Sequence, residues 1–506
     1  MDEFPRTPLP PSAAVRQPHP GRRQVLHAGG LAAAIAALEL VKHSSTIPTR
    51  VPLAVTDGAS SSLPDIQFDI GSYLAPVQTI DGVQVQFGPV HTVFATARLL
   101  RTPTRADQRT LRQALAAIET AYPFTPAGLF TFVAYGLPYF RRLPGGLTGP
   151  QVFVTMPRLI SDVRRYVLEE AVPGPTDVSP ANPGITKQRF DVPVVIEGND
   201  LLFTFRSDNA GNIQDVLAWL SGSNSLAGTP VPSPALSRLL TFTSSRAMFA
   251  QRGLPRKVAD DNGLVFAFMV NPDSPMWMGF VDQQTAGSSA AAPITFQGTE
   301  LTTALPGDYF DNGSVQHLSH VIMDLQQFYD VDDNGVPGSD ADYTERVQYM
   351  FRSTPPPSLG YPDQFTDGGG PAFLQNTFQG TSDALAGARG VGTPGGEHRL
   401  GHLSTLQRSS RDRNGKPLHL RMDGPGFDAM DVPDGSNQPK LQFTAFVPTA
   451  DFFTTMRRNQ ASLDLAQANN VPASDNGLER FMTATRRQNF LVPPRRHRAF
   501  PLIELT

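Results

Sequence analysis

Residues 276–283 read Met-Trp-Met-Gly-Phe-Val-Asp-Gln, and the interpretation of the whole chain depends on the acid in this stretch. Asp282 follows the apolar run Gly-Phe-Val, and the small or polar residues 283–292 come directly after it. This pattern is typical of a strand end that delivers an acid into a cavity and then continues into a loop. The alternative is an Asp that begins a surface turn. The rest of the chain decides between these two interpretations.

The segments around this stretch predict strands that alternate with helices. The apolar run 264–270 predicts a buried strand leading into it, and residues 317–329 predict a strand followed by a helix. Residues 441–447 alternate as a strand does, and a helix is expected to open at Pro448 and Thr449.

The first half of the chain predicts the same unit. Residues 83–100 are rich in β-branched and aromatic side chains and predict a strand. Residues 104–107 have the form of a capping box, and apolar residues recur at helical spacing after them. Residues 192–206 predict two short strands, and a helix is expected from about Asn209. Between these two units, residues 123–190 are interpreted as a long insertion rich in Pro and Gly.

The repeated strand–helix unit predicts an α+β fold that is duplicated, with antiparallel sheets covered by helices. A length of 506 residues agrees with two or three domains. We expect a leader and linker over 1–64, an N-terminal domain over 65–260 and a C-terminal domain over 261–506.

Composition excludes several classes of function. The net charge is −4 and only 17% of the residues are charged, so no global basic field would recruit nucleic acid. The chain has no cysteine, which excludes disulfides, thiolate zinc sites, iron–sulfur clusters and cysteine nucleophiles. The apolar run 28–41 is too short to span a bilayer comfortably, so no integral membrane segment is expected.

The first 50 residues have the layout of an export signal. Arg22 and Arg23 precede two apolar residues and then the apolar run 28–41, as in a twin-arginine signal. Glu39 inside this run and the absence of an Ala-x-Ala cleavage site depart from that pattern. We expect export to the periplasm or outside the cell, with a cytoplasmic location as the alternative.

Two motifs point to metal ions. Asp330, Asp332 and Asn334, with Gly335, match the start of a calcium loop. Ala341 stands where the closing Glu is required, so a solvated acidic loop is the favoured interpretation. His398 and His402 are four residues apart, a spacing that can hold zinc on a helix, but no third ligand is evident. A single histidine acting as an axial ligand needs no second partner nearby.

Residues 417–422 form an apolar, strand-like segment that carries Arg421. A buried arginine normally faces a carboxylate or another anion. The alternative is an arginine on an edge strand that reaches water.

Together these features resemble the dye-decolorizing peroxidase superfamily, whose members have two ferredoxin-like halves and hold haem b in the C-terminal half. Residues 279–283 match four of the five positions of the family motif G-x-x-D-G, with Gln283 in place of the last glycine. His402 stands at the position of the proximal histidine and Arg421 at that of the distal arginine. The resemblance is diffuse in the first half and more specific in the second.

The resemblance implies a peroxidase that reduces hydrogen peroxide and oxidises aromatic or dye-like donors in one-electron steps. His402 would be the axial ligand of the haem iron, with His419 as its rival. Asp282 would be the distal acid–base and Arg421 would keep it ionised. The Gly279–Phe280 backbone would approach the haem.

Other interpretations remain open. Trp277 is a candidate electron relay, although core packing is the commoner role for such a residue. Gln283 favours a haem-free binding or interaction protein on the same fold. The chain is also a candidate for self-association. Residues 500–506 form an apolar tail that is expected to be exposed, so the chain is also a candidate cargo of a protein shell into which this tail would dock.

Overall fold

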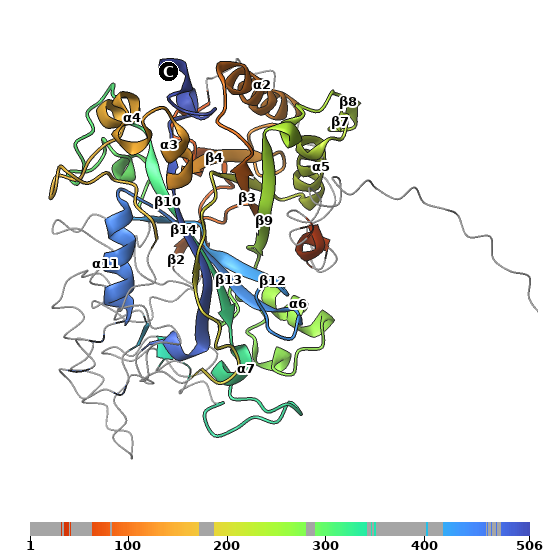
Figure 1. The fold of residues 1–506 in the computed structure, drawn as a ribbon. Helices are drawn as coiled ribbons and strands as arrows, with labels where there is room; N and C mark the ends of the chain where they lie inside the picture. The colour runs from red at the N-terminus through yellow and green to blue at the C-terminus, as the bar shows by residue number, and fades with distance from the viewer. Residues whose placement is uncertain are drawn as a thin grey trace, which may run out of the picture.

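The structure is a computed structural model. It describes residues 63–80, 83–171, 187–279, 289–341, 418–461 and 477–506, together with single residues or short pieces within 32–41, 346–350, 401–402 and 463–472. Figure 1 shows the sheet at the centre and helices on its outer side.

The N-terminal half is a complete ferredoxin-like unit. Its strands follow the order β4-β6-β3-β9, in which the first strand of the unit lies between the third and the fourth. Its elements, in chain order, are β3 (His91–Leu99), α2 (Arg105–Ala121), β4 (Phe130–Gly136), β6 (Leu201–Ser207), α5 (Ala210–Ser221) and β9 (Leu240–Phe249).

The C-terminal half repeats this topology. Strand β13 pairs with both β11 and β12 on one side and with β10 on the other, and β10 also pairs with β14. The elements are β10 (Ser314–Met323), α7 (Leu325–Phe328), β11 (Leu420–Arg421), β12 (Gly424–Asp428), β13 (Gln438–Val447), α11 (Ala450–Ala461) and β14 (Met482–Val492). The predicted α+β fold with duplicated ferredoxin-like units and helix-covered antiparallel sheets is therefore confirmed.

Shorter elements lie before, within, between and after the two repeats. They are η1 (Gly71–Tyr73), β1 (Gln78–Ile80), β2 (Val83–Val85), α3 (Leu137–Arg142), η2 (Gly146–Thr148), α4 (Pro150–Thr155), β5 (Val195–Ile196), β7 (Ser225–Leu226), β8 (Thr229–Pro230), η3 (Leu236–Arg238), α6 (Leu254–Asp261), η4 (Ala267–Met269), η5 (Ala292–Ile294), η8 (Glu479–Phe481), η9 (Arg495–His497) and η10 (Ile503–Leu505).

The two halves share one ten-stranded sheet. Strand β14 pairs with β4, with Phe490 opposite Gly136. The sheet also curls, so that β12 approaches β9 at its far edge. A Cβ on Gly426 of β12 would lie 2.8 Å from the Ala247 carbonyl oxygen of β9. Only glycine allows two backbones to approach this closely.

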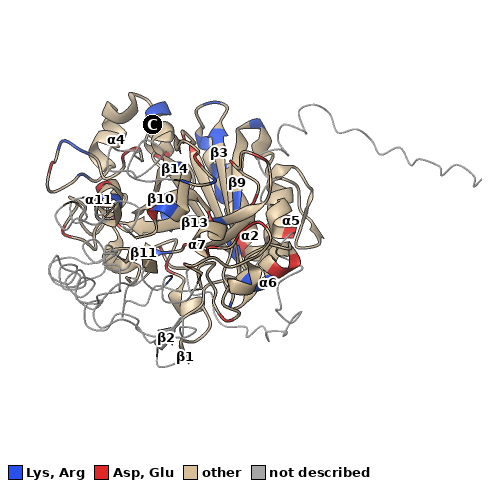
Figure 2. Ribbon diagram, turned by 90° about the horizontal axis from the view of Figure 1, so that it is seen from below, with Lys and Arg blue, Asp and Glu red and all other residues tan. Residues whose placement is uncertain are grey.

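The inner surface of the curled sheet is apolar at one end and charged at the other. At the charged end, buried or half-buried acidic and basic side chains from both halves lie next to one another. Arg486 bonds Asp431 at 2.6 Å and lies 3.5 Å from Glu197, which also pairs with Arg246. The row continues through His320, Asp428 and Lys440, whose successive separations are 3.5–3.7 Å. We call these seven residues the inner charge row. Figure 2 shows that Lys and Arg residues and Asp and Glu residues are interspersed along the ribbon.

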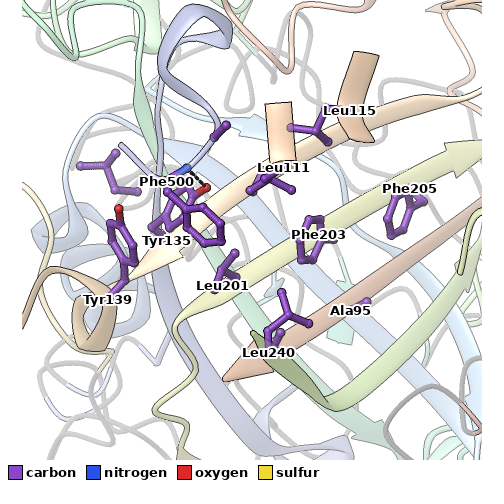
Figure 3. Close-up of a cluster of buried hydrophobic side chains, with 14 of the residues drawn as sticks. Ala95, Leu111, Leu115, Tyr135, Tyr139, Leu201, Phe203, Phe205, Leu240 and Phe500 are labelled. Carbon is purple, nitrogen blue, oxygen red and sulfur yellow. Dashed lines mark hydrogen bonds between the residues drawn. The ribbon is translucent and has the colours of Figure 1, made fainter. Parts of the chain in front are cut away.

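The outer face of the N-terminal half is a packed apolar layer. The predicted capping box is present, because Thr104 and Asp107 each bond the backbone of the other at the start of α2. This helix buries Leu111 and Leu115 against the sheet, where Phe203 and Leu240 also lie (Figure 3). Each such side chain contributes about 1.5–3 kcal/mol by leaving water.

The C-terminal tail belongs to this layer, so the prediction of an exposed tail is wrong. Phe500 and Leu502 are fully buried. The Tyr135 hydroxyl donates to the Arg498 carbonyl oxygen at 2.7 Å. It also accepts from the Phe500 N–H at 2.7 Å (Figure 3). The end of the chain lies beside α2 and α3 (Figure 1). These contacts leave the tail unavailable as a free docking peptide.

Two predicted elements differ in the structure. Residues 264–270 form turns and η4, because their backbone groups bond one another, as in Ala267 N–H to Leu264 O at 2.9 Å. Periodicity alone does not separate such a short buried run from a strand. The predicted insertion 123–190 contains β4, all seven residues of which are buried in the sheet.

Part of the predicted leader is described. Residues 35–39 are helical, and Ala37 and Leu38 are buried in the main apolar core. Glu39, which interrupts the apolar run, accepts a hydrogen bond from the Gln214 side chain of α5 at 2.7 Å. In the described part of the chain, no helix has the length and apolar character needed to cross a membrane.

We predict that Phe500→Ala destabilises the protein by roughly 3–5 kcal/mol, because it removes a fully buried aromatic ring. Urea unfolding followed by circular dichroism measures this change. Leu505→Ala is the matched control, since Leu505 is 47% exposed in the same tail and its loss should cost less than about 0.5 kcal/mol. Equal and small effects of both substitutions would contradict the docked tail.

Candidate functional site

The candidate site lies on the outer face of the C-terminal half, which α11 covers. Four residues from neighbouring strands form one row across this face. Arg421 of β11 is opposite Ala445 of β13, Ala445 is opposite His317 of β10, and His317 is opposite Asn489 of β14. Directly opposed residues in an antiparallel sheet point to the same face. Arg421 and His317 therefore share the helix-covered face.

His317 is the most tightly held polar residue of this row. Its Nδ1 is 2.7 Å from the Asn489 Oδ1, and its Nε2 is 2.6 Å from the Ser319 hydroxyl. Its ring stacks on Phe453 of α11, with 3.3 Å between centroids. Burial lowers the pKa of His317 to about 3, so the ring is neutral at pH 7. The sequence placed His317 in a strand but did not identify it as a site residue.

Arg421 is neither fully buried against an anion nor fully open to water, the two alternatives that the sequence left open. Its side chain is 24% exposed on the short edge strand β11, and its Nε is 4.0 Å from a carboxylate oxygen of Asp423. The guanidinium is thus half-buried with an acid near it. Such a cation can stabilise a negative charge at the helix-covered face.

Asp282, Phe280 and Gln283 lie outside the described residues, but both flanks of their segment are described. Before it, residues 276–279 form a turn rather than the expected strand end, because the Gly279 N–H donates to the Met276 carbonyl oxygen at 3.1 Å. Gly279 has a φ of +78°, which favours glycine.

After this segment, the chain returns to β11. The Ser289 N–H donates to the His419 carbonyl oxygen at 2.8 Å. His419 is two residues before Arg421, so the segment that contains Asp282 ends beside the strand that carries Arg421. Ser289 and His419, which flank Asp282 and Arg421, thus lie together, although Asp282 and Arg421 are 139 positions apart in the sequence.

Trp277 has a packing role. It is 1% exposed, and its Nε1 donates to the Gly426 carbonyl oxygen at 3.0 Å. Its ring meets the edge of Phe249, and its carbonyl oxygen accepts from the Tyr329 hydroxyl at 2.7 Å. The indole therefore joins β12 to β9, and the electron-relay hypothesis stays a prediction.

His402 lies near a buried carboxylate. Glu479 forms a two-pronged ion pair with Arg457 of α11, at 2.7 and 3.1 Å. Burial acts to raise the Glu479 pKa, but Arg457, Lys187 and His402 together hold it below its ordinary value. The His402 side chain is half-exposed. Arg457 is one helical turn beyond Phe453, so His402 approaches the same face as His317 and Arg421.

His419, the rival for the axial position, is 5% exposed, and its ring lies 6.3 Å from that of Phe452, nearly parallel to it. On β11 it points to the same face as Arg421, two residues away. This burial against α11 is typical of a packing residue.

The predicted calcium loop uses its carboxylates to hold its own backbone. Asp332 accepts hydrogen bonds from the N–H groups of Asn334 and Val336, each at 2.8 Å. Asp330 accepts from the Asp340 N–H at 2.8 Å. Within the described ranges, no group of three or more His, Asp or Glu side chains is placed to hold a metal ion. Calcium binding stays a prediction.

Two described residues have side chains whose chemistry suits a haem group. His402 offers an imidazole that is close enough to Glu479 to help lower the pKa of that carboxyl group. Arg421 offers a half-buried cation beside the flank of the Asp282 segment. His402 would hold the iron, and Arg421 would supply a positive charge near the bound group.

Comparison with family models identifies the chain. Residues 165–494, more than half of the chain, match the model of a family of unknown function, DUF7405. The chain belongs to the DUF7405 family. The matched region of this DUF7405 protein includes Arg421, His402, His317 and the whole C-terminal sheet. No curated protein matches the chain.

Solved structures similar to this DUF7405 protein are dye-decolorizing peroxidases. One is a putative DyP-type peroxidase from Shewanella oneidensis, with 15% identity and a TM-score of 0.44, covering 81% of this chain and 94% of that chain. Another is from Cellulomonas bogoriensis, with 14% identity, a TM-score of 0.46, and 84% and 95% covered. A DypB variant from Rhodococcus jostii in complex with haem has 14% identity, a TM-score of 0.45, and 82% and 96% covered.

We predict that Glu479→Gln destabilises the protein by roughly 3–5 kcal/mol at pH 7, because Arg457 loses its buried partner. The lowered pKa of Glu479 means that its contribution is present above the ordinary carboxyl pKa and is lost as pH falls below it. The stability of Glu479→Gln should therefore decrease less than that of the wild type as the pH is lowered.

Urea unfolding between pH 3 and 7 measures both effects. Glu300→Gln is the control, because Glu300 is exposed and its replacement should change stability by less than about 0.5 kcal/mol. If the stability of Glu479→Gln depends on pH as strongly as that of the wild type, the stabilising role assigned to the Glu479 carboxylate is contradicted.

Proposed function

We propose that this DUF7405 protein is a haem-dependent peroxidase that reduces hydrogen peroxide and oxidises aromatic or dye-like donors. The observation that carries the proposal is the hydrogen bond from Ser289 to His419, which ends the Asp282 segment beside Arg421. An acid beside an arginine would suit proton transfer to and from a peroxide. The motif Gly279–Asp282 and the position of His402 support the same function.

The residues have separate roles in this proposal. His402 would hold the iron through its imidazole. Asp282 accepts a proton from the peroxide oxygen nearest to it and returns that proton to the leaving oxygen. Arg421 keeps Asp282 ionised and stabilises the negative charge that develops as the O–O bond breaks. When bound, haem supplies the electrons for this cleavage and later recovers them from the donor.

A haem-free binding protein is the second candidate, and two observations favour it. Gln283 stands where the motif requires glycine, and a side chain there would occupy space close to the proposed haem face. The sheet beneath α11 is also closely filled, since His317 stacks directly on Phe453. Export by the twin-arginine route and self-association remain proposals that accompany either function.

We predict that His402→Ala abolishes haem binding, because it removes the axial ligand. Absorbance of the purified protein, with and without added haem, should show a Soret band for the wild type and none for this variant. His419→Ala is the matched control and should keep the band. A wild-type protein that stays colourless after haem addition would overturn the peroxidase, and loss of the band only in His419→Ala would reassign the ligand.

We predict that Asp282→Asn and Arg421→Leu keep the haem and slow its reaction with hydrogen peroxide by about 100-fold or more, since each removes a group that acts on the bound peroxide. Stopped-flow absorbance measures the rate. Asp333→Asn, in an exposed loop, serves as the control. Wild-type rates in both variants would reject the distal roles.

A further inference from the structure

Part of the predicted leader lies against the folded body. Residues 35–39 are helical, and this short helix lies beside α5 (Figure 1). Ala37, Leu38 and Val41 are only 2%, 1% and 3% exposed, whereas Ile35 and Ala36 are exposed. Positions 37, 38 and 41 fall on one side of a helix, so the segment turns a single apolar face to the body. We call residues 35–39 and Val41 the docked segment.

The apolar face of the docked segment reaches two clusters of buried side chains. Ala37 and Leu38 belong to the main apolar core, which also contains the buried side of α5. Val41 belongs to a second cluster, together with Phe249 of β9 and Val258 of α6. About one helical turn therefore covers the junction between the two clusters. Removal of this apolar surface from water stabilises the docked position.

A hydrogen bond to a charged group holds the docked segment on α5. The Glu39 carboxylate accepts from the Gln214 side-chain amide of α5 at 2.7 Å, in a half-buried position. Hydrogen bonds to an ionised acceptor are stronger than those between neutral groups. Glu39 interrupts the apolar run of the predicted signal, and this contact gives the acid a role in the docked position.

The apolar face of the docked segment cannot serve two partners at once. A helix that binds a lipid surface buries its apolar side at the boundary between headgroups and acyl chains. In the docked segment this side is already covered by the body. Arg22, Arg23 and Lys42 flank the apolar run 28–41, and basic residues beside such a helix favour anionic lipid. An anionic lipid surface is therefore the partner whose chemistry fits the segment when it is free.

We propose that docking of residues 35–39 and Val41 is an autoinhibitory contact, which withholds the apolar run of the leader from an anionic lipid surface. The leader binds such a surface after the docked segment detaches from α5 and α6. The hydrogen bond between Glu39 and Gln214 and the burial of Leu38 oppose this release. The contact is independent of haem and of the proposed peroxidase activity, so either proposal can fail without the other.

Two neighbouring alanines test the docked position. The chain has no cysteine, so Ala36→Cys and Ala37→Cys each introduce a single thiol into the full chain. N-ethylmaleimide, followed by mass spectrometry, should modify the exposed position roughly tenfold or more faster than the buried one, because the thiol must be accessible to react. Equal rates at the two positions would overturn the proposal.

A second carboxylate opposite Glu39 tests the autoinhibition. Gln214→Glu replaces the donor by a like charge, so N-ethylmaleimide should modify Ala37→Cys faster, and vesicles of phosphatidylglycerol and phosphatidylcholine should bind the protein more tightly. Each change should be about tenfold, the worth of a hydrogen bond to a charged group. Gln214→Ala removes the donor without adding a charge and should act in the same direction, but less.

The matched control combines Glu39→Gln with Gln214→Glu. This double variant exchanges the acceptor and the donor, so it should return the modification rate and the vesicle affinity to near their wild-type values. Three results would each overturn the proposal: a wild type that binds the vesicles as tightly as Gln214→Glu does, faster modification in Gln214→Glu without tighter vesicle binding, and no change of either quantity in both Gln214 variants.

Discussion

The inner charge row is the constraint on which the rest of the structure depends. Taking a charged side chain out of water costs several kcal/mol unless an opposite charge meets it, and removing one partner leaves the other exposed to that cost. Arg246 and Glu197 come from the N-terminal half, and Arg486 with Asp431 from the C-terminal half. Glu197 also lies 3.5 Å from Arg486, so the row links the charge pair of one half to that of the other.

This arrangement explains why chemistry is expected on the outer face of the C-terminal sheet. The inner face is occupied by paired charges and close backbone contacts, as at Gly426 and Ala247. On the outer face, Arg421 is half-buried at an edge strand and His402 approaches a buried Glu479. Groups that are partly paired and partly exposed can still act on a ligand, whereas those of the inner charge row are committed to the fold.

Local signals in the sequence predicted most of the fold. The capping box at Thr104, the strand of β13 and the duplicated unit all depend on neighbouring residues, so the sequence contains them directly. The predictions failed where tertiary context decides. Residues 130–136 became a central strand because partners on both sides buried them, whereas residues 264–270 form turns in which their own backbone groups bond one another. His317 was missed because its role comes from Asn489 and Phe453, which are distant in the sequence.

The central claim is that the Asp282 segment returns to the strand of Arg421, and distance between spin labels tests it most directly. The chain has no cysteine, so Asp282→Cys and Arg421→Cys can be labelled with nitroxides without competing sites. The account predicts that the doubly labelled protein shows dipolar broadening beyond the sum of the two singly labelled spectra. A spectrum equal to that sum would contradict the convergence of the two residues.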